Sequence, residues 1–326
     1  MFTTVRRGLS VTGIALLILG SAPPWTVSAP LAAPAQTKSP ATQETFASPE
    51  EAVAALIKAV QANDTKALRA ILGPNSEKLL ASGDPVADAN ARKRFLDDYA
   101  ASHALTPRND GQQVLVIGQN AWPLPIPLVR TGETWRFDAT IGAREIVNRR
   151  IGQNELLTIR TLLAAVEAEK DYFDRVKRGS GTGIYAERML STADRKDGLY
   201  WDAPSGEAPS PLGPLIEQAE SEGYHGAVSP TGVPVPYHGY VYRILKSRGP
   251  NAPGGIKNYV MNGQMTEGFA LVAWPAAFEN SGIMTFVVDQ DGIVFQKDLG
   301  PNTAKIAAGM TSFNPDVTWS RIDISD

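Results

Sequence analysis

The chain has 326 residues, of which 43% are hydrophobic and 20% charged, as in ordinary globular proteins. Its formal net charge is −3 and its basic residues are spread along the chain, which argues against a nucleic-acid partner. It contains no cysteine and three histidines, so disulfides and thiolate metal sites are excluded and histidine-based metal sites lack ligands. We therefore expect no metal and no other cofactor.

The first 35 residues have the pattern of a secretory signal peptide. A basic pair, Arg6-Arg7, precedes an uncharged run over 9–22, which is shorter than the roughly 20 apolar residues that a spanning helix needs. Ala33-Pro34-Ala35 is a signal-peptidase pattern and predicts cleavage before Gln36. We therefore expect a periplasmic or secreted protein without an integral membrane span after cleavage. The arginine pair is also compatible with twin-arginine export.

Residues 36–45, rich in Pro, Ala and Thr, predict a disordered tether, and 46–142 predict a first domain. Ser48 and Asp64 are suited to cap helices, and Gly73-Pro74 ends the second one. The apolar pattern predicts a third helix at 88–101, strands at 114–118 and 133–138, and an extended segment at 123–129. Helices followed by a short antiparallel sheet define an α+β domain.

Residues 143–326 predict a second α+β domain. The stretch from Ala143 to Arg178 has no proline and carries an apolar stripe, which predicts one long helix. A loop-rich region over 179–236, with one short helix at 211–222, leads to strands at 240–245, 269–275, 283–288 and 293–296. The sequence 289–292, Asp-Gln-Asp-Gly, is read as a hairpin turn because it lacks the closing glutamate and flanking helices of a calcium loop.

Six segments are distinctive: 122–127, 148–155, 239–245, 249–255, 268–275 and 282–288. They resemble the bacterial domain-of-unknown-function family 2950 (DUF2950), over nearly the whole chain after the signal peptide. The resemblance implies an envelope or secreted protein, and it brings no established catalytic residues.

Two weaker resemblances concern the halves. Asn154-Glu155 before a helix, Gly239-Tyr240 at a strand start and Ala273-Trp274-Pro275 at a strand end are similar to the globular head of type IV pilins and pseudopilins. Pilins begin with a hydrophobic assembly helix, whereas the corresponding helix here is internal and amphipathic. The first half is similar in layout to the nuclear transport factor two-like (cystatin-like) cone, a pocketed α+β fold.

Candidate binding residues lie in the loops and strands of the second half. Tyr237 and His238 adjoin the long loop region, where an exposed histidine can exchange protons near neutral pH. Asn251 belongs to a glycine-rich loop that lacks the lysine and following helix of a phosphate cradle. Trp201 and Trp274 are candidates for an aromatic platform that binds a sugar or peptide.

No motif commits the chain to a reaction, and its catalytic residues remain unknown. Recognition needs shaped loops and aromatic anchors, which are present, whereas catalysis needs positioned titrating groups, which the sequence does not reveal. We therefore expect a non-enzymatic binding or assembly module whose partner is an envelope protein or a cell-wall component. The alternatives are a hydrolase of a cell-envelope polymer, with acids that meet only in the fold, and a pilus-like structural subunit.

Overall fold

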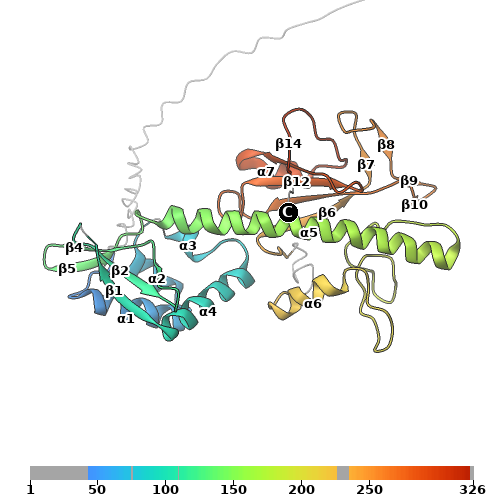
Figure 1. Cartoon of the computed structure of the whole chain (residues 1–326). Helices are drawn as coiled ribbons and strands as arrows, with labels where there is room; N and C mark the ends of the chain where they lie inside the picture. Colours follow the sequence, from blue (N-terminus) through green and yellow to red (C-terminus); the bar gives the residue numbers. More distant parts are fainter. Residues whose placement is uncertain (1–42, 75, 109, 226–234, 324–326) are drawn as a thin grey trace, which may run out of the picture. The chain divides into compact units, whose positions relative to one another are not determined.

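Figure 1 shows a computed structural model of the chain, which describes residues 43–323 except 75, 109 and 226–234. The expected signal peptide lies outside the described residues, as does most of the expected tether. All described residues belong to one compact unit. Gln43 and Glu44 already take part in it, because the Gln43 amide donates to the carbonyls of Ile71 and Phe137 and the Glu44 N–H donates to that of Ala70. The folded part therefore begins before residue 46.

The first half opens with four helices, α1 Pro49–Gln61, α2 Thr65–Leu72, α3 Glu77–Leu80 and α4 Pro85–Ala101. All of them except α3 begin at a residue whose side chain caps the helix. The Ser48 hydroxyl accepts a hydrogen bond from the Glu51 N–H at 3.1 Å, as predicted. Asp64 caps α2 and Asp84 caps α4 in the same manner, each through one carboxylate oxygen that accepts two backbone N–H groups. The sequence predicted α1, α2 and most of α4, and it missed the single turn α3.

The first sheet is antiparallel, with the order β1-β2-β4-β5 and β3 paired to β2. Its strands are β1 His103–Pro107, β2 Gln113–Ile117, β3 Trp122–Pro123, β4 Leu128–Thr131 and β5 Thr134–Phe137. Leu115, Ile117 and Phe137 point from this sheet into a core shared with Leu56 of α1 and Leu68 of α2. Burial of these side chains is what fixes the helices on the sheet.

The long helix α5, Ala143–Ser180, begins where the backbone turns sharply at Gly142. Gly142 has a φ of 87°, and a Cβ there would lie 1.9 Å from the carbonyl oxygen of Pro125, so only glycine fits. The helix buries a stripe that includes Ile151, Leu162 and Val166. None of the helices in the described part of the chain is both long and apolar enough to cross a bilayer.

The second sheet is also antiparallel and has the order β14-β13-β12-β11-β6. Its strands are β6 Tyr240–Leu245, β11 Ala270–Pro275, β12 Met284–Asp289, β13 Val294–Asp298 and β14 Ser320–Arg321. The β12–β13 hairpin confirms the turn expected at 289–292, where the Gly292 N–H donates to the Asp289 carbonyl. The other elements are short: α6 Gly213–Ser221, β7 Ser247–Arg248, β8 Lys257–Asn258, β9 Val260–Met261, β10 Gln264–Met265, η1 Gly300–Asn302 and α7 Thr303–Ala308.

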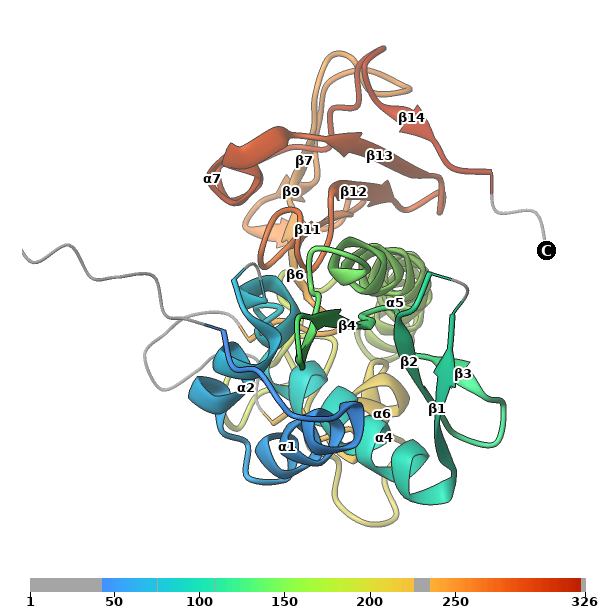
Figure 2. The same ribbon diagram turned by 90° about the vertical axis from the view of Figure 1, so that its left-hand side faces the viewer.

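Helix α5 packs along the second sheet (Figure 2). The Asn154 amide donates to the Ser281 carbonyl at 2.9 Å, and one carboxylate oxygen of Glu155 accepts the N–H groups of Ile283 and Met284 at 3.0 Å each. Leu162 and Val166 of α5 enter a second core with the strands β6, β11 and β12. The fold is α+β, as predicted, whereas the division into two domains at residue 142 stays a prediction because the described residues form one unit with two cores.

Candidate functional site

A cavity of about 910 Å³ lies between α4, α5 and the first sheet. The residues of α4 and α5 that line the cavity recur at helical spacing, so they lie on one side of each helix. From α4 they are Ala87, Asp88, Asn90, Ala91, Arg92, Arg94, Phe95 and Asp98, and from α5 they are Ile146, Arg149, Arg150, Gln153, Asn154 and Leu157.

The interior of the cavity is apolar and its rim is polar. Buried aliphatic side chains form the deepest part, which consists of Leu56, Leu68, Leu72, Ile117, Leu124 and Ile126. Half-buried Phe95, Trp122 and Leu157 extend the apolar wall outward. Exposed Arg94, Asp98, Arg149, Gln153 and Gln218 surround the opening. This distribution is typical of sites for small molecules, in which apolar walls hold the ligand and a few polar groups orient it.

One edge of the cavity is fixed by Asp84, the buried cap of α4. One of its carboxylate oxygens accepts the Tyr224 O–H at 2.9 Å and the Gly239 N–H at 2.8 Å. The Asn90 amide donates to the Glu222 carbonyl at 2.8 Å nearby. These bonds join the start of α4 to two segments of the second half, so residues distant in sequence line a common cavity.

His238 reaches the cavity from a tight turn between Tyr237 and Tyr240. Both central residues have positive φ, 49° at His238 and 75° at Gly239, as in a type I′ turn. The turn is closed by hydrogen bonds in both directions between the backbones of Tyr237 and Tyr240. A Cβ at position 239 would lie 2.6 Å from the Asn154 amide nitrogen, so the turn requires glycine there.

The His238 ring pairs with a carboxylate and packs at a tilt against two tyrosine rings. Its Nε2 lies 3.2 Å from Glu222 Oε2, and its centroid lies 4.1 Å from that of Tyr237. Burial lowers the pKa of His238 and outweighs the opposite effects of Glu222 and Asp84, while the positive charge of Arg94 lowers this pKa further. Burial also raises the pKa of Tyr237 to about 12. The imidazole is therefore mainly neutral at neutral pH, and it is a donor and acceptor rather than a fixed charge.

Two of the four cavity arginines hold the end of α3. Arg150 donates to the carbonyls of Lys78 at 2.8 Å and Leu79 at 3.0 Å, and Arg92 donates to that of Leu80 at 2.9 Å. Arg150 also donates to the side-chain oxygen of Asn280 at 2.9 Å. Burial lowers the pKa of Arg150, against the opposing charge of Asp88. These arginines satisfy the last carbonyls of a helix that is too short to satisfy them itself.

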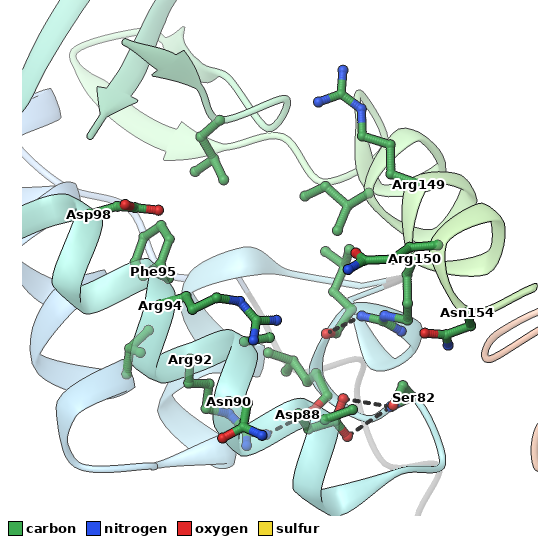
Figure 3. A pocket seen from close by; sticks show the side chains of 18 of the residues that line it. Ser82, Asp88, Asn90, Arg92, Arg94, Phe95, Asp98, Arg149, Arg150 and Asn154 are labelled. Atoms are coloured by element: carbon green, nitrogen blue, oxygen red, sulfur yellow. Dashed lines mark hydrogen bonds between the residues drawn. The ribbon is translucent and has the colours of Figure 1, made fainter. Parts of the chain in front are cut away.

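The other two arginines differ in direction (Figure 3). Arg149 points away from Arg150, and its Nε lies 2.7 Å from Glu145, which does not line the cavity. Arg94 extends from α4 into the space between α4 and α5. Within the described residues, Arg94 has no hydrogen-bond or ion-pair partner among protein groups. Among the described residues, Arg94 is therefore the cavity arginine whose donors have no protein partner.

This site can bind a ligand, and its capacity for acid–base chemistry is limited to His238 and the neighbouring carboxylates. Among the described residues, no group of three or more histidines and carboxylates is placed to hold a metal ion. The four arginines and the three carboxylates Asp88, Asp98 and Glu222 leave a net charge of one positive unit on the lining. Such a lining favours a neutral or anionic ligand over a cationic one.

The residues predicted from sequence are dispersed in the structure. His238 lines the cavity with Tyr237 beside it, and it is half-buried and paired, not exposed as expected. Trp201 packs on Tyr172 with a ring separation of 6.4 Å, away from the cavity lining. Asn251 is exposed, and its backbone N–H donates to the Asn314 side chain at 2.7 Å. Trp274 is buried in the second sheet beneath Arg243, and an aromatic platform of Trp201 and Trp274 stays a prediction.

Sequence reasoning missed the cavity residues of α4 and α5. The sequence assigned them no role, because nothing in it shows that the two helices face each other. A signal did exist on α5, because the segment 148–155 belonged to the family resemblance and contains Arg150 and Asn154. No corresponding signal marked Arg94 or Phe95.

Two helix-covered antiparallel sheets and a cavity with an apolar interior define an α+β protein with the features of a small-molecule site. The chain belongs to the family described as "Protein of unknown function (DUF2950)", whose model matches residues 43–322. No curated protein matches the chain, and no solved structure matches it.

Proposed function

We propose that the protein is an exported, non-enzymatic binding module of the cell envelope, which holds a small apolar or amphipathic molecule in the cavity. The observation that carries this proposal is the cavity itself, with its aliphatic interior and polar rim. Its volume of about 910 Å³ falls within the range of about 300–1,000 Å³ that small-molecule sites occupy. The export of the protein rests on the signal-peptide pattern, and a cell-wall or lipid component is the natural source of such a ligand there.

The energetic basis is the transfer of apolar ligand surface out of water, which contributes about 25 cal/mol per Å². The aliphatic side chains of the interior offer this surface without polar groups that a ligand would leave unpaired. The two halves of the chain both contribute to the walls, because Tyr224 and His238 line the cavity together with side chains of α1 and α2. A bound ligand is therefore expected to stabilise the whole unit against unfolding.

The test is to fill the cavity without disturbing the fold. Ala91 is exposed on α4 and lines the cavity, whereas Ala89 is exposed on the same helix and does not line it. We expect Ala91→Trp to weaken binding of the apolar fluorophore N-phenyl-1-naphthylamine at least about tenfold, equivalent to about 1.4 kcal/mol. Ala89→Trp, with the same change in helix propensity, is expected to bind as the wild type does. Equal binding by both variants would reject the cavity as the site.

The layout of each half supports a finer proposal. Helices α1, α2 and α4 cover one sheet and leave a cavity, as in the nuclear transport factor two-like cone, while α5 lies along the second sheet as in a pilin head. On this basis the first half supplies most of the binding site, and the second half supports assembly or attachment to an envelope partner. Filament formation by the purified protein would favour the pilus-like alternative.

A hydrolase remains a second candidate because of one pair of residues. His238 and Glu222 lie 3.2 Å apart at the cavity, and a neutral imidazole next to a carboxylate can act as a general base. No nucleophile among the described residues is hydrogen-bonded to this histidine ring. Assays of peptidoglycan or glycan turnover separate this candidate from the binding module.

A further inference from the structure

The charged side chains that line the cavity indicate which charge its ligand carries. This inference rests on the proposed function and deepens it. Every charged side chain of the lining can be assigned to a partner within the fold, or shown to have none among the described residues.

The acidic side chains are largely occupied. Both carboxylate oxygens of Asp88 accept the Ser82 N–H, at 2.9 and 3.2 Å. Glu222 pairs with His238 through one oxygen and accepts from the Gln218 amide at 3.1 Å through the other. Asp98 is the remaining acid, it is exposed, and Figure 3 shows its carboxylate apart from the Arg94 guanidinium.

The basic side chains leave one clear donor. Arg92 and Arg150 donate to carbonyls at the end of α3, and Arg149 is paired with Glu145 outside the cavity. Arg94 and Arg150 enter the space between α4 and α5 from opposite helices (Figure 3). The Asp88 carboxylate already opposes the charge of Arg150, whereas Arg94 has no hydrogen-bond or ion-pair partner among the described residues. Arg94 is exposed enough to meet a ligand, and it adjoins the apolar wall at Phe95.

From these contacts we infer that the cavity binds an amphiphile with an anionic head group, carboxylate or phosphate, which Arg94 recognises while the hydrocarbon tail lies against Phe95 and the buried aliphatic side chains. Guanidinium groups bind both head groups through paired N–H donors. The apolar interior excludes a purely polar anion, because such a ligand would leave the aliphatic walls unfilled. A cationic amphiphile would place its charge beside Arg94 and be rejected.

The experiment compares ligands that share a tail and differ in the head. Binding of dodecanoate, dodecyl phosphate, dodecanol and dodecyltrimethylammonium to the purified exported protein is measured by displacement of N-phenyl-1-naphthylamine, below micellar concentrations. We expect the two anions to bind at least about tenfold more tightly than the alcohol, equivalent to about 1.4 kcal/mol, and the cation to bind most weakly. The ratio of dodecanoate to dodecyl phosphate affinity then identifies the head group.

Substitutions assign the selectivity to one side chain. We expect Arg94→Gln to abolish the preference for the anions, which is about tenfold, since one charge-assisted contact is lost. Binding of dodecanol, which has no charge, is expected to stay unchanged. Lys93→Gln is the matched control, because it removes the same charge from the adjacent residue of α4. Lys93 does not line the cavity. Asp98→Asn is expected to strengthen anion binding, as it removes a negative charge near the opening.

The outcomes distinguish this inference from the proposed function. If dodecanol and the fluorophore bind but Arg94→Gln leaves the anion preference intact, or if the cation binds as well as the anions, the head-group inference is wrong and the cavity remains a site. If neither the fluorophore nor any of the amphiphiles binds, both the cavity function and the inference built on it are wrong.

Discussion

The two cores of this protein differ in the side chains that fill them. Among the largest fully buried side chains, the second core contains Tyr240, Tyr259, Phe269, Phe286 and Phe313, whereas the first contains Phe137 as its sole aromatic residue of that kind. Some of these rings contact one another, as Tyr240 and Phe286 do at a centroid separation of 5.8 Å. The first half places smaller aliphatic side chains between its helices and sheet, and the cavity lies beside them. Whether a helix-on-sheet layer is filled or hollow thus depends on side-chain volume more than on topology.

Helix α5 contributes to both the cavity and the second core, in different parts of its length. Its first part presents Ile146, Arg150 and Leu157 to the cavity, while its middle part packs Leu162 and Val166 into the second core. The change occurs within a single uninterrupted helix. A ligand in the cavity therefore contacts the same rigid element that supports the second sheet.

The largest expected effect comes from the filled core. Phe286→Ala removes a fully buried ring from β12, and we expect it to lower the free energy of unfolding by about 3–5 kcal/mol. Phe95→Ala is the comparison, because Phe95 is half-buried on the cavity wall and its removal enlarges an existing space. Urea denaturation of both variants measures the difference. Equal losses would contradict the view that the first half is loosely filled.

The next effect concerns the joint between the regions. Asp84→Ala removes a buried carboxylate that accepts four hydrogen bonds and leaves the Tyr224 hydroxyl without its acceptor, so we expect a loss of about 3 kcal/mol. Asp64→Ala removes an equivalent but exposed cap from α2, for which about 1 kcal/mol is expected. Thermal unfolding compares the two. If Asp84→Ala costs no more than its control, the bonds to Tyr224 and Gly239 contribute little.

The smallest effect is a change in pH dependence within the filled core. Glu169 is fully buried on α5, with one oxygen 2.9 Å from the Ala186 N–H and the other without a partner among the described residues. Burial raises the pKa of Glu169 well above its usual value near 4.5. Between these two pKa values the folded state binds more protons than the unfolded state, so stability falls as the pH rises.

Glu169→Gln replaces the titrating carboxyl group with a neutral amide, which still offers an acceptor for the Ala186 N–H. At pH 5 we expect the variant to differ from the wild type by no more than about 1 kcal/mol, and at higher pH to become the more stable of the two. The lowered pKa of His238 acts in the opposite direction, since it makes stability rise with pH below about 6.5, but it is common to both proteins. Denaturation of both proteins from pH 5 to pH 8 measures the difference. A constant difference would show that Glu169 does not titrate in this range.

The regular elements could be predicted wherever burial imposes a pattern on the sequence. The strand at 240–245 was predicted with its observed bounds, and the long helix from residue 143 was predicted to within two residues of its end. Strand β1, His103–Pro107, was missed because it is a largely exposed edge strand without alternation of apolar residues. Strand β14 and helix α3 are too short to leave any periodic signal.

The candidate site was harder to predict because it depends on tertiary contacts. His238 and Tyr237 were found through the scarcity of histidine and the aromatic residues around it. Arg94 and Arg150 lie on different helices, and only the folded chain shows that their side chains enter one space. Asn251, Trp201 and Trp274 were selected by residue type, which carries no information on where a side chain points.

The short helix α3 has a consequence for the order in which the chain folds. It has no fully buried side chains of its own, and its terminal carbonyls depend on Arg92 of α4 and on Arg150, which lies 71 and 72 positions away from Leu79 and Lys78. A single turn is unstable in isolation, because a helix nucleus fixes several residues for one hydrogen bond. We therefore expect helix α3 to form after α4 and α5 have docked, and to complete the cavity wall late in folding.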